Sequence, residues 1–105
     1  MCIKRRNEFR TNNSKKAQGH PAYIYGKEGD EYLFIGITHS PITQGIKNIR
    51  LDKNPNKFDK KTSYARPFPS IDDVSLFGPK KKKWKLSRKD KRKMKRIKKR
   101  QRLET

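Results

Sequence analysis

The stretch HPAYIYGKEGDEYLFIGIT, residues 20–38, holds the densest group of apolar and aromatic side chains in the chain. Two segments within it, 21–25 and 32–38, are rich in Tyr, Ile and Phe, which favour β-strands. The segment between them, 26–30, is polar and contains two glycines that can adopt the positive φ of a turn. We therefore predict an antiparallel β-hairpin from this stretch.

The two histidines of the chain flank this hairpin, because His20 precedes its first strand and His39 follows its second. Antiparallel pairing predicts that the two imidazoles meet at one end of the sheet. Imidazole exchanges a proton near neutral pH, so one histidine can act as base and the other as acid when RNA is cleaved by its own 2′-hydroxyl. The alternative is that both are polar strand-end residues without a catalytic role.

The positive charge of the chain is unevenly distributed. Of 105 residues, 38% are charged and 30% are hydrophobic, and the net charge is +20. Residues 1–18 contribute +5, residues 19–79 contribute +1 and residues 80–105 contribute +14. A chain of this length forms one domain. We expect a flexible basic N-terminal arm over 1–18, a small antiparallel-sheet module over 19–79 and a strongly basic helical tail over 80–105.

Other segments show weaker patterns. Residues 46–51 show the period-two alternation of side chains that predicts a strand. Residues 63–68 predict a shorter strand, which its prolines end early. Residues 70–77 fit one helical turn or an irregular loop equally well. Ser87 begins a Ser-x-x-Asp capping box, and a helix rich in Lys and Arg follows it to about residue 103. The predicted fold class is α+β, a small antiparallel sheet of three to four strands with a basic C-terminal helix.

Composition argues against several functional classes. No stretch approaches the roughly twenty apolar residues that a membrane span needs, and the basic N-terminus lacks the apolar segment of a secretory signal. Cys2 is the only cysteine, and no Cys/His cluster has the spacing of a zinc site. We expect a cytoplasmic protein that needs no metal or cofactor and does not associate with membranes.

Polar side chains on the predicted strands are candidates for binding a phosphodiester. An arginine binds phosphate through two parallel hydrogen bonds, and hydroxyl groups add single ones. Together with the two histidines, Arg66 is a candidate catalytic residue. The candidate phosphate contacts of the module are Thr38, Arg50, Ser63 and Tyr64. The alternative for each is a solvated strand face or, for Tyr64, a partly buried ring.

The tail gives the strongest prediction of a ligand. Its sixteen Lys and Arg residues, against two acidic ones, favour nucleic acid, bound by counterion release in a salt-dependent and sequence-independent way. Trp84 can stack on a base or anchor the tail to the module. The candidate nucleic-acid-binding residues of the tail are Lys80, Lys81, Lys82, Lys83, Trp84, Arg88, Arg92 and Arg96. We favour RNA over DNA as the partner.

Short motifs across the chain resemble those of small phage- and plasmid-borne proteins of bacteria. They are His-Pro-Ala-Tyr-Ile-Tyr, Tyr-Leu-Phe-Ile-Gly-Ile-Thr-His, Asn-Pro-Asn, Ser-Tyr-Ala-Arg-Pro and Trp-Lys-Leu-Ser. The strand-end His, Thr, Ser and Arg residues resemble the barnase–EndoU–colicin–RelE nuclease group over about residues 19–90. The resemblance implies a small α+β fold with a four-stranded antiparallel sheet, and RNA cleavage without metal. It assigns catalytic and phosphate-binding roles to His20, Thr38, His39, Ser63, Tyr64 and Arg66.

Two functions from different classes stay open. The first is a small, toxin-like, metal-independent endoribonuclease that uses histidine acid/base chemistry, with the basic ends of the chain holding the RNA. The second is a non-enzymatic RNA- or DNA-binding protein, such as a ribosome-associated or phage accessory protein. A third and weaker alternative is a protein that coats nucleic acid or an acidic partner. An acidic protein or an antitoxin is therefore a further candidate partner.

Overall fold

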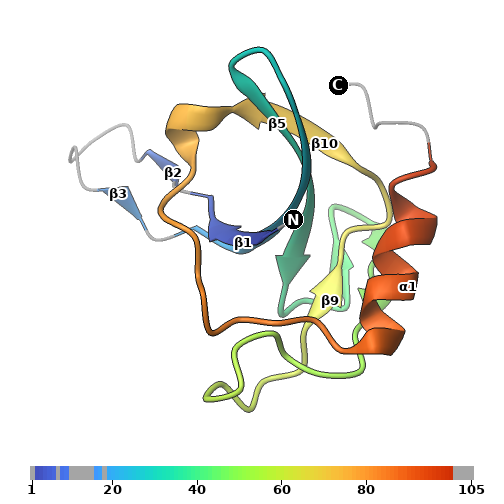
Figure 1. Cartoon of the computed structure of the whole chain (residues 1–105). Helices are drawn as coiled ribbons and strands as arrows, with labels where there is room; N and C mark the ends of the chain where they lie inside the picture. Colours follow the sequence, from blue (N-terminus) through green and yellow to red (C-terminus); the bar gives the residue numbers. More distant parts are fainter. Residues whose placement is uncertain (1, 7, 10–15, 18, 101–105) are drawn as a thin grey trace.

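The hairpin predicted from residues 20–38 is at the centre of the structure, a computed structural model (Figure 1). Strand β4 (Pro21–Glu28) and strand β5 (Glu31–Thr38) pair antiparallel around a two-residue turn. The turn is shorter than expected because Gly29 supplies the positive φ, 57°, that a tight turn needs. The structure describes residues 2–6, 8–9, 16–17 and 19–100.

The predicted α+β class is confirmed, although the main sheet has six strands in the described part of the chain rather than three to four. Its order is β1-β4-β5-β9-β8. The sixth strand, β10, pairs with the first half of β5, on the same edge as β9. The added strands of this sheet are β1 (Cys2–Arg5), β8 (Ile49–Arg50), β9 (Tyr64–Ala65) and β10 (Ser70–Asp73). Two separate hairpins are β2 (Glu8–Phe9) with β3 (Lys16–Ala17), and β6 (Ile42–Thr43) with β7 (Ile46–Lys47). The strand predicted over 46–51 is thus split into β7 and β8.

β9 and β10 are two pieces of one interrupted strand along β5. The buried residues Pro67 and Pro69 lie between them, and proline cannot donate a ladder hydrogen bond. The strand predicted over 63–68 ends early for this reason. Residues 70–77 were expected to form a helical turn or a loop. They contain one helical turn, the 3-10 turn η1 (Val74–Leu76), but it follows a strand, β10, that was not expected. Pairing with β5 stabilises β10, and the local sequence does not encode that pairing.

The expectation of a flexible arm over 1–18 is wrong for the first described residues. Cys2–Arg5 form β1, which pairs antiparallel with β4. The side chain of Ile3 is only 4% exposed. A single buried isoleucine among cations gives no periodic signal in the sequence. The strand is instead favoured because it hydrogen-bonds to backbone groups of β4 that would otherwise be unpaired at an edge of the hairpin. Residues 1, 7, 10–15 and 18 lie outside the described part of the chain.

Both faces of the sheet are covered by apolar side chains. On one face the sheet packs against the tail. The buried members of this main core are Ile3, Ile35, Ile37, Leu51, Ala65, Leu86, Met94 and Ile97. On the other face, Phe77 packs edge-to-face on Tyr32 and Phe34, with ring centroids 5.3 and 5.1 Å apart. This second cluster extends along β4 as far as Ala22. The side chains at the end of this face, beyond Ala22, are polar.

The basic tail is part of the fold along most of its length. The backbone N–H groups of Gly78 and Lys81 donate to the carbonyls of Arg5 and Ile3 at 2.8 and 2.9 Å, so this segment follows β1. Helix α1 (Arg88–Ile97) then packs on the main core, beside β9 in Figure 1. Within the described residues, no helix is both long enough and apolar enough to cross a membrane.

Helix α1 begins at the predicted N-cap. Oγ of Ser87 accepts a hydrogen bond from the backbone N–H of Asp90 at 3.1 Å. The carboxylate of Asp90 does not complete a capping box, because it accepts hydrogen bonds from the backbone N–H groups of Asp52 and Lys53. The helix ends at Ile97, earlier than predicted, and residues 101–105 lie outside the described part of the chain.

Candidate nucleic-acid interface

The outer face of helix α1 carries only positive charge. The helix turns Asp90, Met94 and Ile97 inward, and their spacing of four and three residues defines one helix face. Asp90 is the only acidic residue of the helix, and it is completely buried. The exposed residues of the helix and of the turn after it are Arg88, Lys89, Lys91, Arg92, Lys95, Arg96, Lys99 and Arg100. The outer face of α1 therefore presents cations without a carboxylate among them.

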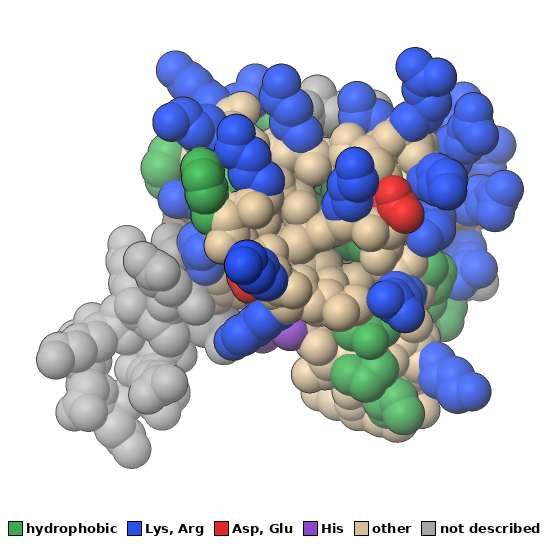
Figure 2. Space-filling model, turned by 90° about the horizontal axis from the view of Figure 1, so that it is seen from below, with side chains coloured by type: hydrophobic (Ala, Val, Ile, Leu, Met, Phe, Trp, Pro, Cys, Tyr) green, Lys and Arg blue, Asp and Glu red, His purple; other side chains and the backbone are tan. Residues whose placement is uncertain are grey.

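The segment that leads to α1 adds a second group of cations. Its exposed lysines are Lys80, Lys82, Lys83 and Lys85. Trp84 is half-buried, packs against the main core and has the guanidinium of Arg5 4.8 Å from its ring centroid. Nζ of Lys81 lies 5.5 Å from the same centroid. Trp84 therefore anchors the tail. In the view of Figure 2, Lys and Arg side chains are scattered around much of the molecule, with uncharged surface between them.

Several of the predicted phosphate contacts lie in a row across the sheet. Thr38 in β5 is the register partner of Tyr64 in β9, and Tyr64 is the partner of Arg50 in β8. Directly paired residues project from the same face of a sheet. The β4–β5 register pairs Ala22 with Gly36, and a continuation of this register by two residues would bring His20 opposite Thr38. These four residues therefore share one end of one face.

Arg66 belongs to the same face, two residues after Tyr64. Its backbone N–H donates to the carbonyl of Gly36 at 2.8 Å, and a β-carbon on Gly36 would lie 3.1 Å from Cγ of Arg66. Gly36 therefore leaves room for the arginine side chain. The Arg66 guanidinium donates to Oδ1 of Asn48 at 2.7 Å. The sheet-end group, as we call it below, consists of His20, Thr38, Arg50, Tyr64 and Arg66.

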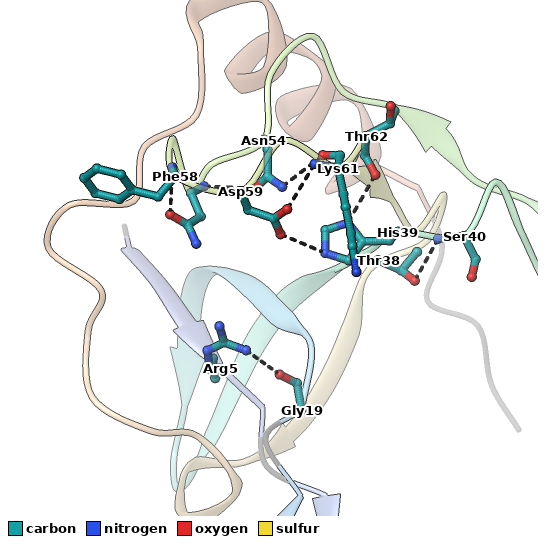
Figure 3. A network of polar contacts seen from close by, with 11 residues as sticks. Arg5, Gly19, Thr38, His39, Ser40, Asn54, Phe58, Asp59, Lys61 and Thr62 are labelled. Carbon is teal, nitrogen blue, oxygen red and sulfur yellow. Dashed lines mark hydrogen bonds and ion pairs between the residues drawn. The ribbon is translucent and has the colours of Figure 1, made fainter.

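His39 projects from the opposite face and fastens a loop. Its Nδ1 lies 3.1 Å from the carbonyl oxygen of Thr62, and its Nε2 lies 3.3 Å from Oδ2 of Asp59 (Figure 3). These two contacts join the residue after β5 to both ends of the segment 59–62. Among the described residues, no hydrogen bond or ion pair joins His39 to His20.

A β-bulge explains why the two histidines do not share a face. From the turn, the register pairs Glu28 with Glu31, which in a regular hairpin would place His20 opposite His39. The register shifts by one between Ile24 and Gly26. A shift of one residue moves the partner side chain to the other face of the sheet. The histidines therefore lie at the same end of the hairpin on opposite faces.

The loop over residues 52–62 is held by hydrogen bonds from side chains to nearby backbone, as in Asx turns. Three such bonds are Asn56 N–H to Asn54 Oδ1 at 2.9 Å, Phe58 N–H to Asn56 Oδ1 at 3.1 Å and Lys61 N–H to Asp59 Oδ1 at 3.0 Å. The bond from the Lys61 N–H lowers the pKa of Asp59 below its ordinary value, and the charge of His39 lowers it further. The loop thus has a defined shape.

Two residues at this loop differ from the sequence predictions. Ser63, a predicted phosphate contact, is 1% exposed, and in the described part of the chain its Oγ has no hydrogen-bond partner. Phe58 was not singled out, but its side chain is 76% exposed. The sequence does contain a signal for this exposure, because Phe58 is the only aromatic residue within the polar stretch 52–62. Such a residue has no apolar partner at strand or helix spacing.

No protein-family model matches the chain, and neither a curated protein nor a solved structure matches it. The resemblance to the nuclease group therefore stays a prediction. Among the described residues, no three His, Cys, Asp or Glu side chains form a group that can hold a metal ion. The function must therefore be inferred from the arrangement of the side chains. A basic helix packs on one face of the sheet, and the sheet-end group lies on the other face.

Proposed function

We propose that this protein binds RNA through the basic surface of its tail, without recognising the base sequence. The observation that supports the proposal is the orientation of α1, which buries its only carboxylate and exposes its cations. Phosphates that bind such a surface release their counterions. The logarithm of the binding constant then falls linearly with the logarithm of salt concentration, by about 0.7 for each phosphate neutralised on a single strand.

Two arginines of α1 provide the test. Arg92 and Arg96 are exposed, and neither has a carboxylate partner among the described residues. The double variant Arg92→Gln/Arg96→Gln should bind RNA more weakly, with a salt slope reduced in magnitude by about 1 to 2. The matched control is Lys27→Gln/Lys47→Gln, which removes the same charge from exposed positions of β4 and β7. Equal losses in both double variants would show that net charge, and not α1, carries the binding.

A second candidate function is metal-independent RNA cleavage by the sheet-end group. The observation that favours it is the strand register, which puts Tyr64 and Arg50 on the face of Thr38 and, when continued, brings His20 to the same end. In this scheme His20 takes the proton of the 2′-hydroxyl, whose oxygen attacks the adjacent phosphorus. The bond from phosphorus to the 5′-oxygen breaks, and that oxygen takes a proton from Tyr64. Arg50 and Arg66 stabilise the charge on the phosphate oxygens.

Cleavage of RNA in EDTA by wild type, His20→Ala and His39→Ala tests this second function. The His20→Ala variant should lose cleavage and keep RNA binding, because the tail is unchanged. The His39→Ala variant should retain cleavage, since His39 projects from the other face. Cleavage that depends on His39 and not on His20 would overturn the assignment to the sheet-end group. Binding without any cleavage by wild type would exclude the second function and leave the first.

A further inference from the structure

Phe58 stands out from the loop over 52–62. Among the large apolar side chains of the described residues it is the most exposed, at 76%, against 55% for Ile42. Figure 3 shows its ring directed away from the loop and from the pair formed by His39 and Asp59. An exposed aromatic ring loses the free energy that burial would provide. A site for a ligand gives this exposure a function.

The exposure is a product of the loop's hydrogen bonds. The backbone N–H of Phe58 donates to Oδ1 of Asn56, and the next residue, Asp59, pairs with His39. Asn54 Nδ2 also donates to the carbonyl of Lys61 at 3.0 Å, which joins the two sides of the loop. These bonds fix the backbone on both sides of Phe58. The ring is therefore presented by a preorganised segment.

Lys57 connects the ring to a basic pocket, because it lies beside the ring and also lines the pocket. Nζ of Lys57 lies 5.3 Å from the ring centroid of Phe58. A pocket of about 350 Å³ is formed by the loop and by the ends of the strands on either side of it. The cations that line this pocket are Arg50, Lys53, Lys57, Lys60 and Lys61. They outnumber its two carboxylates, Asp52 and Asp59, and the second of these already pairs with His39. The pocket thus favours an anion.

Ser63 gives the pocket an unused hydroxyl. It belongs to the pocket lining, is buried, and its Oγ has no hydrogen-bond partner among the described residues. A buried hydroxyl without a partner is destabilising. A rotation of the side chain toward the pocket would let a ligand oxygen satisfy it.

We infer that the loop over 52–62 binds single-stranded RNA, with an unpaired base stacked on Phe58 and the adjoining phosphate in the pocket. The inference rests on the proposed RNA-binding function and specifies the class of RNA. Stacking on an exposed aromatic ring needs a base whose face is free, as in a single strand, whereas the bases of a duplex stack on each other. The lysines that line the pocket favour a polyanion over a protein surface, because the cores of protein interfaces are depleted of lysine.

The test measures binding of the full chain to an oligouridine and to an RNA duplex with the same number of phosphates. Phe58→Ala should lose about tenfold in affinity for oligouridine and keep its affinity for the duplex. Phe58→Trp should keep both affinities, and its added fluorescence should be quenched by oligouridine beyond the response of Trp84 in wild type. The matched control is Ile42→Ala, which removes another large apolar side chain that is exposed and should change neither affinity.

The outcomes separate this inference from the function on which it rests. In one outcome, wild type binds both RNAs, and Phe58→Ala binds oligouridine as tightly as Ile42→Ala does. The proposed stacking site would then be wrong, whereas the proposal that the tail binds RNA would be unaffected. An equal loss for oligouridine and duplex would also overturn the inference, because a stacking site discriminates between them. If wild type binds neither RNA, the proposed function itself fails.

Discussion

The carboxylate of Asp90 in α1 accepts a 2.7 Å hydrogen bond from the backbone N–H of Asp52, a residue 38 positions earlier in the chain. It accepts a second bond from the N–H of Lys53 at 3.1 Å. Nζ of Lys93 donates to the carbonyl of Arg50 at 2.8 Å and strengthens the same junction. The most basic element of the protein is thus fixed to the start of the loop over 52–62 by its only acidic side chain.

Asp90→Ala should destabilise the protein by about 2–4 kcal/mol, because it leaves two backbone N–H groups without their charged acceptor at a buried site. The free energy of unfolding in urea measures this loss. Lys89→Ala changes the neighbouring exposed residue and should change stability by less than about 0.5 kcal/mol. Equal stabilities of the two variants would show that Asp90 does not hold the helix to the sheet.

Ser87→Ala should destabilise the protein by about 1 kcal/mol, because the backbone N–H of Asp90 loses its cap. Ser87→Asp should keep most of the stability, since a carboxylate caps the same N–H and interacts well with the helix N-terminus. Thermal unfolding followed by circular dichroism measures both variants. If Ser87→Asp were as unstable as Ser87→Ala, the loss would not come from the cap.

Ile3→Ala should cost about 2–4 kcal/mol, as expected for truncating a side chain in a packed core. Ile42→Ala makes the same chemical change at a side chain that is 55% exposed, and should cost much less. Urea unfolding of the two variants gives the comparison. Similar values for the two would mean that β1 contributes little to the core.

The sequence predicted the elements whose signals are local. The turn of the hairpin follows from Gly29 and its polar neighbours, and the start of α1 follows from Ser87. It did not predict β1 or β10, because both are stabilised by pairing with distant strands, and Ile3 is a lone apolar residue in a basic segment. Local patterns contain no information on such partners.

The candidate site was predicted in part for the same reason. His20, Thr38, Arg50, Tyr64 and Arg66 were singled out as polar residues at strand ends, and strand register brings them to one face. The bulge near Tyr25 adds one residue to β4, and this moves His39 to the other face. Gly26, next to Tyr25, is the local signal of a bulge, but the prediction places this glycine in the turn. The partner of His39, Asp59, lies in a loop that the sequence identified only as polar.

Stability at acid pH should depend on Asp59. Its pKa in the folded protein lies below the ordinary value of 3.8, chiefly because of the hydrogen bond from the Lys61 N–H. A lowered folded-state pKa means that the stabilisation is present above the unfolded-state value and is lost as the pH falls through the folded-state value. Asp59→Asn should therefore lose stability relative to wild type at pH 6, and the difference should shrink as the pH falls below 3.8. Urea unfolding at a series of pH values measures it, and a difference independent of pH would contradict the prediction.

Asn48 should be a stabilising centre of the β6–β7 hairpin. Its Nδ2 donates to the carbonyl of Ser40 at 2.9 Å and to Oγ1 of Thr43 at 2.8 Å, and its Oδ1 accepts from Arg66. Asn48→Ala removes all three bonds and should cost about 2 kcal/mol at this half-buried position. Thr43→Val removes one of them and should cost about 1 kcal/mol or less. Urea unfolding compares the two, and an equal loss would mean that the bonds to Ser40 and Arg66 contribute nothing measurable.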